Sequence, residues 1–386
     1  MLHQTITTGF LKALEHLAYG RFSVTTPDGK NYDFIGKGEG AHGTMHIRDW
    51  RTVSAMAQRG DIGLTEAYRD GWWDTQDLTA LLLVGLQNQE ALHRYIYGSA
   101  FTRAVTRFFY LFKRNTLKGS ERNIHAHYDL GNDFYALWLD PSMTYSSAIF
   151  ADENPCLTGA QHHKYDRILE RLGKPSGALM EIGCGWGGFA QRALEKGDYA
   201  IKAITLSPAQ HAYATKRLGD RANLLIEDYR HQQGKYDHIV SIEMFEAVGE
   251  RYWSTYFSKV KELLADKGRA VIQTITVAEK HFESYRKGGD MIRSFIFPGG
   301  MLPSPKRFAE QAAMQDLRVT DAYAFGQDYA RTLNQWLDNF EQKLSEIIQL
   351  GFDEKFIRIW RFYLAACIAS FTIGRTDVMQ LELQHA

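Results

Sequence analysis

The sequence predicts an α/β fold in which helices cover both faces of a mostly parallel sheet, together with a smaller N-terminal α+β domain. From residue 169 onward, short apolar runs typical of buried strands alternate with helical patterns, as they do in parallel sheets. The chain has 386 residues, which is enough for two domains. We therefore expect an accessory domain over residues 1–115 and the sheet-containing domain over residues 116–386.

The elements of the second domain follow from this alternation. Strands are expected at 178–182, 199–205, 224–227, 236–242, 269–275 and 319–325. Helices are expected at 189–196, 208–218, 250–264, 330–350 and 353–370. The segment 282–303 is apolar and aromatic but interrupted by Gly and Pro, so neither a helix nor a strand is predicted there. It could line an apolar pocket or be a packed loop.

The N-terminal region mixes the two patterns. We expect helices at 7–18, 50–59 and 78–96, a strand at 45–50, and a hairpin over 21–35 with its turn at Pro27-Asp28-Gly29. The residues alone favour a structural appendage here. The following segment, 98–122, interleaves six basic residues with aromatic ones and could be either a membrane-surface helix or a core helix with solvated charges.

Composition limits the class of protein. Lys plus Arg and Asp plus Glu both number 45, so overall charge does not favour a nucleic-acid partner. The three cysteines, Cys156, Cys184 and Cys367, have no metal-ligand spacing and are typical of a reducing compartment. The first residues show no apolar signal sequence, and the longest apolar stretch, 362–371, is about half a bilayer span. We expect a cytoplasmic protein without a metal site that contacts membranes only at their surface.

The most informative stretch is 178–189, where a short strand ends in Glu181 and is followed by Gly183, Gly185, Gly187 and a helix. Glycines allow a ligand to approach the backbone, and the helix N-terminus offers free N–H groups. The alternative is an ordinary strand-to-helix turn. The order of strand, acid, glycines and helix resembles the S-adenosylmethionine site of Rossmann-like methyltransferases. Thr205, Asp228 and Glu243 follow other strands and should share this edge of the sheet.

Other motifs accompany this turn in a fixed order. They are Gly71-Trp72-Trp73, His127-Tyr128-Asp129-Leu130-Gly131-Asn132-Asp133, Asp140-Pro141 with Met143 and Tyr145-Ser146, Leu206-Ser207 with Gln210, Asp228-Tyr229-Arg230, and Phe297-Pro298 with Leu302-Pro303. Together they resemble the cyclopropane fatty acid synthase family, including its mycolic acid branch, over nearly the whole chain. The resemblance implies a Rossmann-like methyltransferase domain. It also implies that the N-terminal domain assists homodimer formation and binding to the inner face of the membrane.

The resemblance implies a reaction as well. S-adenosylmethionine and a cis-unsaturated acyl chain of a phospholipid would react through a carbocation to give a cyclopropane. Tyr128 matches a tyrosine near that cation, and Tyr145 and Ser146 match residues that hold S-adenosylmethionine. The remaining expected cofactor-binding residues are Glu181, Gly183, Gly185, Gly187, Thr205, Leu206, Gln210, Asp228 and Tyr229.

The part of the family pattern that binds a bicarbonate base is broken. Ser147 replaces a Cys, Gln273 replaces a His and Glu243 replaces a Gly, whereas Glu246 and Tyr329 match. Bicarbonate dependence is therefore doubtful, and we hypothesise that Glu243 is a built-in base oriented by Gln273, Ser147 and Tyr329, with Glu246 as the supporting carboxylate. Three alternatives stay open: a methylene- or methyl-branched product, a non-catalytic lipid- or S-adenosylmethionine-binding protein, and a small-molecule methyltransferase.

Overall fold

A computed structural model describes residues 2–99, 130–151 and 156–386, with side chains described from residue 8 onward. The chain forms two compact units. The described parts of the first unit are residues 2–99, 284–298 and 345–375, and those of the second are 130–151, 156–283, 299–344 and 376–386. The first unit thus includes two later segments that the sequence analysis did not assign to the N-terminal region.

The first unit contains a four-stranded sheet in the order β2-β1-β3-β4. Its strands are β1 (Tyr19–Thr25), β2 (Asn31–Ile35), β3 (Gly38–Ile47) and β4 (Trp73–Asp74). The predicted hairpin is confirmed, because β1 and β2 pair antiparallel across a turn at Gly29, whose φ is 79°. The same turn closes with a bond from the N–H of Gly29 to the carbonyl of Thr26.

Helices make up the rest of the first unit. They are α1 (Leu2–Leu14), α2 (Arg51–Arg59), α3 (Asp61–Arg69), α4 (Leu78–Gln87), α5 (His93–Tyr97), the π-helix η5 (Ile292–Ile296) and α17 (Glu354–Thr372), with α16 (Leu344–Gln349) beginning at the unit boundary. The single helix predicted at 78–96 is wrong. The buried Asn88 amide accepts from the N–H groups of Ala18 and Tyr19 and donates to the carbonyls of Val84 and Tyr19, which ends α4.

The segment 282–303 also differs from the prediction of no regular structure. Helix α13 (Glu279–Lys287) and η5 both fall within or across it. The buried Arg293 guanidinium binds the Asp290 carboxylate and the carbonyls of Tyr285 and Gly288, and so holds the turn between these helices. Such side-chain-to-backbone bonds are not visible as a periodic pattern.

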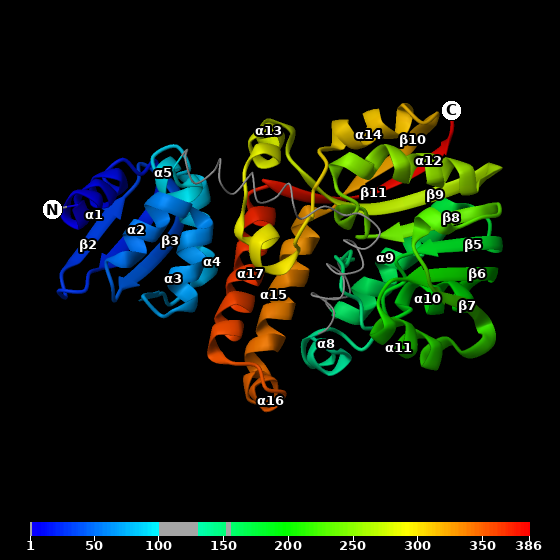
Figure 1. The fold of residues 1–386 in the computed structure, drawn as a ribbon, viewed down its shortest axis with the longest axis horizontal. Helices are drawn as coiled ribbons and strands as arrows, with labels where there is room; N and C mark the ends of the chain where they lie inside the picture. Colours follow the sequence, from blue (N-terminus) through cyan, green and yellow to red (C-terminus); the bar gives the residue numbers. More distant parts are fainter. Residues whose placement is uncertain (1, 100–129, 152–155) are drawn as a thin grey trace. The chain divides into compact units, whose positions relative to one another are not determined.

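The second unit is built on a seven-stranded sheet in the order β10-β11-β9-β8-β5-β6-β7 (Figure 1). The strands are β5 (Ser176–Ile182), β6 (Asp198–Thr205), β7 (Ala222–Ile226), β8 (Tyr236–Ile242), β9 (Leu264–Val277), β10 (Leu317–Ala324) and β11 (Thr376–His385). The first five are parallel and β11 is antiparallel to both neighbours. The predicted mostly parallel sheet is confirmed, but β11 was not predicted.

Helices cover both faces of this sheet, with α9, α10 and α11 on one face and α12 and α14 on the other (Figure 1). The helices of the second unit are α8 (Asn132–Trp138), α9 (Leu157–Leu172), α10 (Gly188–Lys196), α11 (Pro208–Leu218), α12 (Trp253–Leu263), α14 (Pro305–Ala313) and α15 (Gly326–Gln342). Short 3-10 turns are η1 (Gly219–Arg221), η2 (Tyr229–His231), η3 (Phe245–Ala247) and η4 (Glu250–Tyr252). The predicted helix at 330–350 is interrupted at Lys343.

Apolar packing fixes the glycine-rich turn at the edge of the sheet. Ile168 of α9 and Phe189 of α10 pack with Leu179 of β5 and Ile201 of β6 in one buried cluster. The helix that follows the glycines is therefore held against the sheet, and the turn stays at the carboxyl ends of β5 and β6. Across the described part of the chain, none of the helices combines the length and apolar character needed to cross a membrane.

Within the first unit, we expect Arg358 of α17 to be a large single contributor to stability. Its guanidinium donates to the carbonyls of Tyr68 and Trp73 and lies 3.8 Å above the Tyr68 ring. Arg358→Met should lower the free energy of unfolding by about 3 kcal/mol, because two buried carbonyls lose a charged donor. Urea unfolding of the full chain measures this. Lys355→Met on the same helix is the control, since its exposed pair with Asp70 is worth less than about 1 kcal/mol. Equal losses in the two variants would contradict the prediction.

Candidate active site

A cavity lies at the carboxyl edge of the second unit's sheet. It is lined by the loop before α9, the turn between β5 and α10, and the ends of β6 and β8. The predicted cofactor-binding residues that line it are Tyr145, Ser146, Glu181, Gly183, Gly185, Thr205, Leu206, Gln210 and Tyr229. Gly187 and Asp228 are not among its lining residues. The fold therefore gathers residues from six separate segments around one space.

The glycines of the turn have different roles. Gly183 and Gly185 have φ values of 87° and 52°. A Cβ on Gly185 would have no atom within 4 Å, so this residue keeps part of the cavity free of side-chain atoms. A Cβ on Gly187 would lie 3.2 Å from Ala214, so Gly187 allows α10 and α11 to pack closely.

Glu181 lies at the end of β5 and is 2% exposed. Its Oε2 has no hydrogen-bond partner among the described residues. Burial raises the pKa of Glu181 well above its usual range, and the charge of Lys164 opposes that rise. An unpartnered carboxylate oxygen beside a cavity fits a ligand that carries a positive charge or N–H and O–H donors.

Lys164 is a site residue that the sequence analysis missed. It is 0% exposed, and its Nζ donates to Ser146 Oγ at 2.7 Å and lies 4.3 Å from the Tyr165 ring centroid. Burial lowers its pKa to about 7, although the carboxylates of Glu243, Asp140 and Glu181 favour its charged form. The signal was present, since Lys164 falls on the apolar face of the helical pattern with Ala160 and Ile168.

Asp228, at the end of β7, is an expected cofactor-binding residue but does not line the cavity. Asp228 accepts two bonds from the Arg230 guanidinium, at 2.8 and 2.6 Å, and also caps η2. The neighbouring Glu227 and Tyr229 line the cavity instead. The Glu227 carboxylate, also missed from the sequence, accepts from Gln232 at 2.7 Å. Thr205 and Gln210 bond each other at 2.9 Å on the adjacent wall.

Glu243 is the centre of a second cluster in the cavity wall. Its backbone has a φ of 50°, and its N–H donates to the Gln273 carbonyl at 2.8 Å. Oε1 of its carboxylate accepts from the Ser147 N–H and from Gln273 Nε2, both at 2.8 Å. Oε2 accepts from the Tyr329 hydroxyl at 2.6 Å. The structure thus places around Glu243 the three residues that the hypothesis from the sequence assigned to orient it.

The donors around Glu243 oppose the effect of burial on its pKa. Burial raises the pKa of Glu243, while bonds from Tyr329, Ser147 and Gln273 and the charge of Lys164 lower it. A left-handed backbone at a non-glycine residue costs roughly 1–2 kcal/mol. Such strain persists where surrounding contacts fix it, and here it directs the carboxylate into a ring of donors.

Glu246 lies behind Glu243 and does not line the cavity. Its Oε1 accepts from the Ile275 N–H at 2.5 Å and from Thr274 Oγ1 at 3.0 Å. Burial, together with the charge of Glu243, raises the pKa of Glu246 to about 8. The negative charge of Glu243 thus favours the protonated form of Glu246, and the donors around Glu243 favour its own ionised form.

An aromatic cluster supports the cavity wall at Tyr145. The Tyr145 ring is 5.4 Å from the rings of Tyr135 and Trp336 and 5.6 Å from that of Trp138. Packed rings of this kind exclude water and present a face that attracts a cation. Tyr128 and segment 100–122 lie outside the described residues.

The two expected bound groups fit these residues differently. The open space at Gly185 and the unpartnered Glu181 oxygen fit S-adenosylmethionine, which carries a sulfonium cation and several donors. A bicarbonate ion fits poorly, because Ser147, Gln273 and Tyr329 already donate to the Glu243 carboxylate. A second anion next to Glu243 would also be repelled.

Comparison with known proteins agrees with the geometry. Residues 115–381 match the family described as mycolic acid cyclopropane synthetase. The chain is 37% identical to the tuberculostearic acid methyltransferase UfaA1 of Mycobacterium tuberculosis, over 85% of this chain and 80% of that protein. It is 35% identical to the cyclopropane-fatty-acyl-phospholipid synthase of Escherichia coli, over 84% of each.

A solved structure shares the fold. The mycolic acid cyclopropane synthase CmaA1, in complex with SAH and CTAB, superposes with a TM-score of 0.64 and 33% sequence identity. The match covers 68% of this chain and 98% of that one. SAH is the product that remains when S-adenosylmethionine has given up its methyl group.

Gly185→Ala should abolish binding of S-adenosylmethionine while the fold survives. The added Cβ meets no protein atom, so it occupies only space that the ligand needs. Titration calorimetry with S-adenosylmethionine measures the effect. Gly29→Ala is the matched control, since its φ is also positive and its added Cβ is equally unobstructed, so the backbone strain of about 1 kcal/mol is shared. Unchanged affinity in Gly185→Ala would remove the turn from the binding site.

Glu246 should make the folded protein less stable as the pH rises. Its pKa is raised from 4.5 to about 8, so its contribution to stability is complete below pH 4.5 and is lost as the pH rises through about 8. Glu246→Gln keeps an acceptor for Ile275 and Thr274 but cannot ionise. Between about pH 5 and pH 8 its free energy of unfolding should therefore fall less than the parent's. Glu262→Gln, at an exposed site on α12, should follow the parent. Equal pH slopes in the parent and Glu246→Gln would refute this.

Proposed function

The chain belongs to the mycolic acid cyclopropane synthetase family of S-adenosylmethionine-dependent methyltransferases, and we propose that it transfers a one-carbon unit to the cis double bond of an unsaturated phospholipid acyl chain, with Glu243 as the base. The observation that carries this proposal is the Glu243 carboxylate in the cavity wall, held by Ser147, Gln273 and Tyr329. A carboxylate in this setting can accept a proton beside the cofactor.

The chain's own residues have distinct tasks in this reaction. Bound S-adenosylmethionine supplies the electrophilic methyl group. The glycine turn lets that group approach, and Lys164 holds the hydroxyl of Ser146, which also lines the cavity. The aromatic faces around Tyr145 exclude water and stabilise the cation that forms on the acyl chain. Oε2 of Glu243 then takes a proton from that cation, and the electrons of the broken C–H bond close a cyclopropane ring.

A second product is favoured by a specific observation. If hydride migrates along the acyl cation before Glu243 removes a proton, the C–H electrons form a double bond and the product carries a methylene branch. A base tied to the protein reaches fewer protons than a bound ion does. The 37% identical relative is named a methyltransferase and not a cyclopropane synthase, which agrees with this alternative.

The setting of the reaction is also part of the proposal. The relative from Escherichia coli is named for fatty-acyl phospholipids, and this chain matches it over 84% of its length. We therefore assign a phospholipid in the cytoplasmic face of a membrane as the substrate, with peripheral binding through segment 98–122. The N-terminal domain, residues 1–115, would assist that binding and formation of a homodimer. The ordered donors around Glu243 argue against a non-catalytic binding protein.

The activity should not depend on bicarbonate. In buffer freed of carbonate, we expect the parent to methylate oleoyl phospholipid vesicles at the same rate with and without added bicarbonate. Glu243→Gln should lose at least about 100-fold in kcat, the usual contribution of a general base. Mass spectrometry should show a gain of one CH₂ group in the acyl chain, and mild hydrogenation separates a resistant ring from a methylene branch.

Glu243→Gly tests whether added bicarbonate can replace the carboxylate that is proposed to be the base. Removing the carboxylate should leave an enzyme that is inactive alone but partly restored by bicarbonate, because Tyr329 and the Ser147 N–H become available to an anion. The proposal is wrong if the parent needs bicarbonate or if Glu243→Gln keeps full activity.

A further inference from the structure

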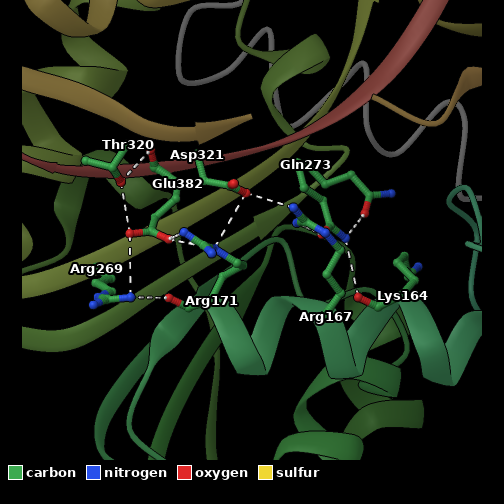
Figure 2. A network of polar contacts seen from close by, with 9 residues as sticks. Lys164, Arg167, Arg171, Arg269, Gln273, Thr320, Asp321 and Glu382 are labelled. Carbon is green, nitrogen blue, oxygen red and sulfur yellow. Dashed lines mark hydrogen bonds and ion pairs between the residues drawn. The ribbon is translucent and has the colours of Figure 1, made fainter. Parts of the chain in front are cut away.

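A line of hydrogen bonds runs from the surface of the second unit to Glu243. Arg167 of α9 donates to Asp321 at 2.7 Å and, through its other terminal nitrogen, to Gln380 Oε1 at 2.7 Å. Gln380 Nε2 donates to Gln273 Oε1 at 3.0 Å, and Gln273 Nε2 donates to Glu243 Oε1 at 2.8 Å. Figure 2 shows Arg167 between Asp321 and the Gln273 side of this network.

The strands make this line possible. Gln380 of β11 and Gln273 of β9 are directly paired residues of adjacent antiparallel strands, so their side chains share one face of the sheet. Both are 0% exposed. Gln273 in turn pairs with Ile242 at the end of β8, one residue before Glu243.

Arg167, with help from the Lys164 carbonyl, sets the direction of the bonds in the line. A guanidinium only donates, so the end of Gln380 that faces it has to be the carbonyl. The amide nitrogen of Gln380 then faces Gln273 and the Lys164 carbonyl, which only accepts. Gln273 must therefore turn its own carbonyl toward Gln380 and its NH₂ toward Glu243.

We propose that Arg167 and Gln380 are positioning residues that keep Gln273 as a donor to Glu243 and thereby direct the incoming proton to Oε2. The proposal rests on the proposed role of Glu243 as the base. Oε1 already accepts from Ser147 and Gln273, so a proton there would have to displace a donor. Oε2 faces only the Tyr329 hydroxyl among the bonds of this carboxylate, and a hydroxyl can turn from donor to acceptor.

Without Arg167, only the long bonds to the Lys164 and Ser147 carbonyls, at 3.3 and 3.5 Å, oppose a turn of both amides. The Gln273 carbonyl would then face Glu243, where it would accept a bond from a protonated carboxyl group and oppose an ionised one. Loss of the line therefore favours the neutral form of Glu243 and raises its pKa. The other titratable groups that face Glu243 are Lys164 of α9, Glu246 of η3 and Tyr329 of α15, with Glu181 of β5 acting through Lys164.

The test is the pH dependence of kcat for methylation of oleoyl phospholipid vesicles. In Arg167→Met, the acidic limb of the pH profile of kcat, where activity falls because Glu243 is protonated, should move to higher pH by about one unit. This is the usual effect of losing one hydrogen bond to a charged group. KM for S-adenosylmethionine should not change. Arg167→Lys should restore the parental limb, because lysine also only donates.

Arg171→Met is the matched control. Arg171 lies one helical turn farther along α9 and binds Asp321 and Glu382, but no bond connects it to Gln380 among the described contacts (Figure 2). It should keep the parental pH limb even if its stability falls. A shift of equal size in Arg171→Met would overturn the proposal, because a general loosening of the β10–β11 edge would then explain both.

Gln380→Glu tests the direction of the bonds by a substitution that keeps the size of the side chain and so leaves no cavity. The new carboxylate accepts from Arg167 but cannot donate to Gln273, so Gln273 must turn its NH₂ toward it and present its carbonyl to Glu243. The acidic limb should rise at least as far as in Arg167→Met. If the acidic limb is unshifted in both Arg167→Met and Gln380→Glu while Glu243→Gln is inactive, the proposed role of the hydrogen-bond line is wrong but Glu243 remains the base. Full activity of Glu243→Gln overturns the base itself.

Discussion

A carboxylate at the tip of a buried strand must be solvated by the protein, and the second unit is arranged around that requirement at Glu243. The loop before α9, the strand β9 and the helix α15 each supply one donor to this carboxylate. None of these donors is close to Glu243 in sequence. The requirement therefore ties together the parallel core of the sheet, its antiparallel edge and a helix that follows both.

The charges around the cavity form a second constraint. The carboxylates of Glu181 and Glu243 interact electrostatically with one buried amine, that of Lys164, and Glu246 interacts with Glu243. Burial disfavours each of these charges, and the protein's response is to protonate the carboxylate farthest from the cavity and to surround Glu243 with donors. The result is a cavity lined by the carboxyl groups of Glu181, Glu227 and Glu243, which is suited to a cationic cofactor and a cationic intermediate.

Features encoded by short stretches could be predicted from the sequence. The five parallel strands, the glycine turn and Glu181 follow from local periodicity and motif order, and the hairpin follows from its turn residues. The role of Glu243 could be hypothesised because Ser147 and Gln273 depart from a family pattern at the same time. The strand β11 was missed because Gln380 and Glu382 occupy buried positions in it, so its apolar alternation is broken by residues whose partners lie far along the chain. The break at Asn88 was missed for the same reason, since its bonds come from Ala18 and Tyr19. Lys164 was missed although its place on the apolar face of α9 is visible in the sequence.

The first unit is formed by three separate segments, because the chain leaves it and returns to it twice. Helix α17 contacts α3 and α4, and Arg358 on it binds the carbonyls of Tyr68 and Trp73, yet these residues are separated by most of the second unit's sequence. The two units are therefore not modules that one recombination event could exchange, nor could one proteolytic cut release either intact. A gene fragment that encodes residues 1–112 would lack α17 and expose the apolar surface that this helix covers. Insertion or loss of the N-terminal region during evolution would consequently require compensating changes in α17, near the opposite end of the sequence.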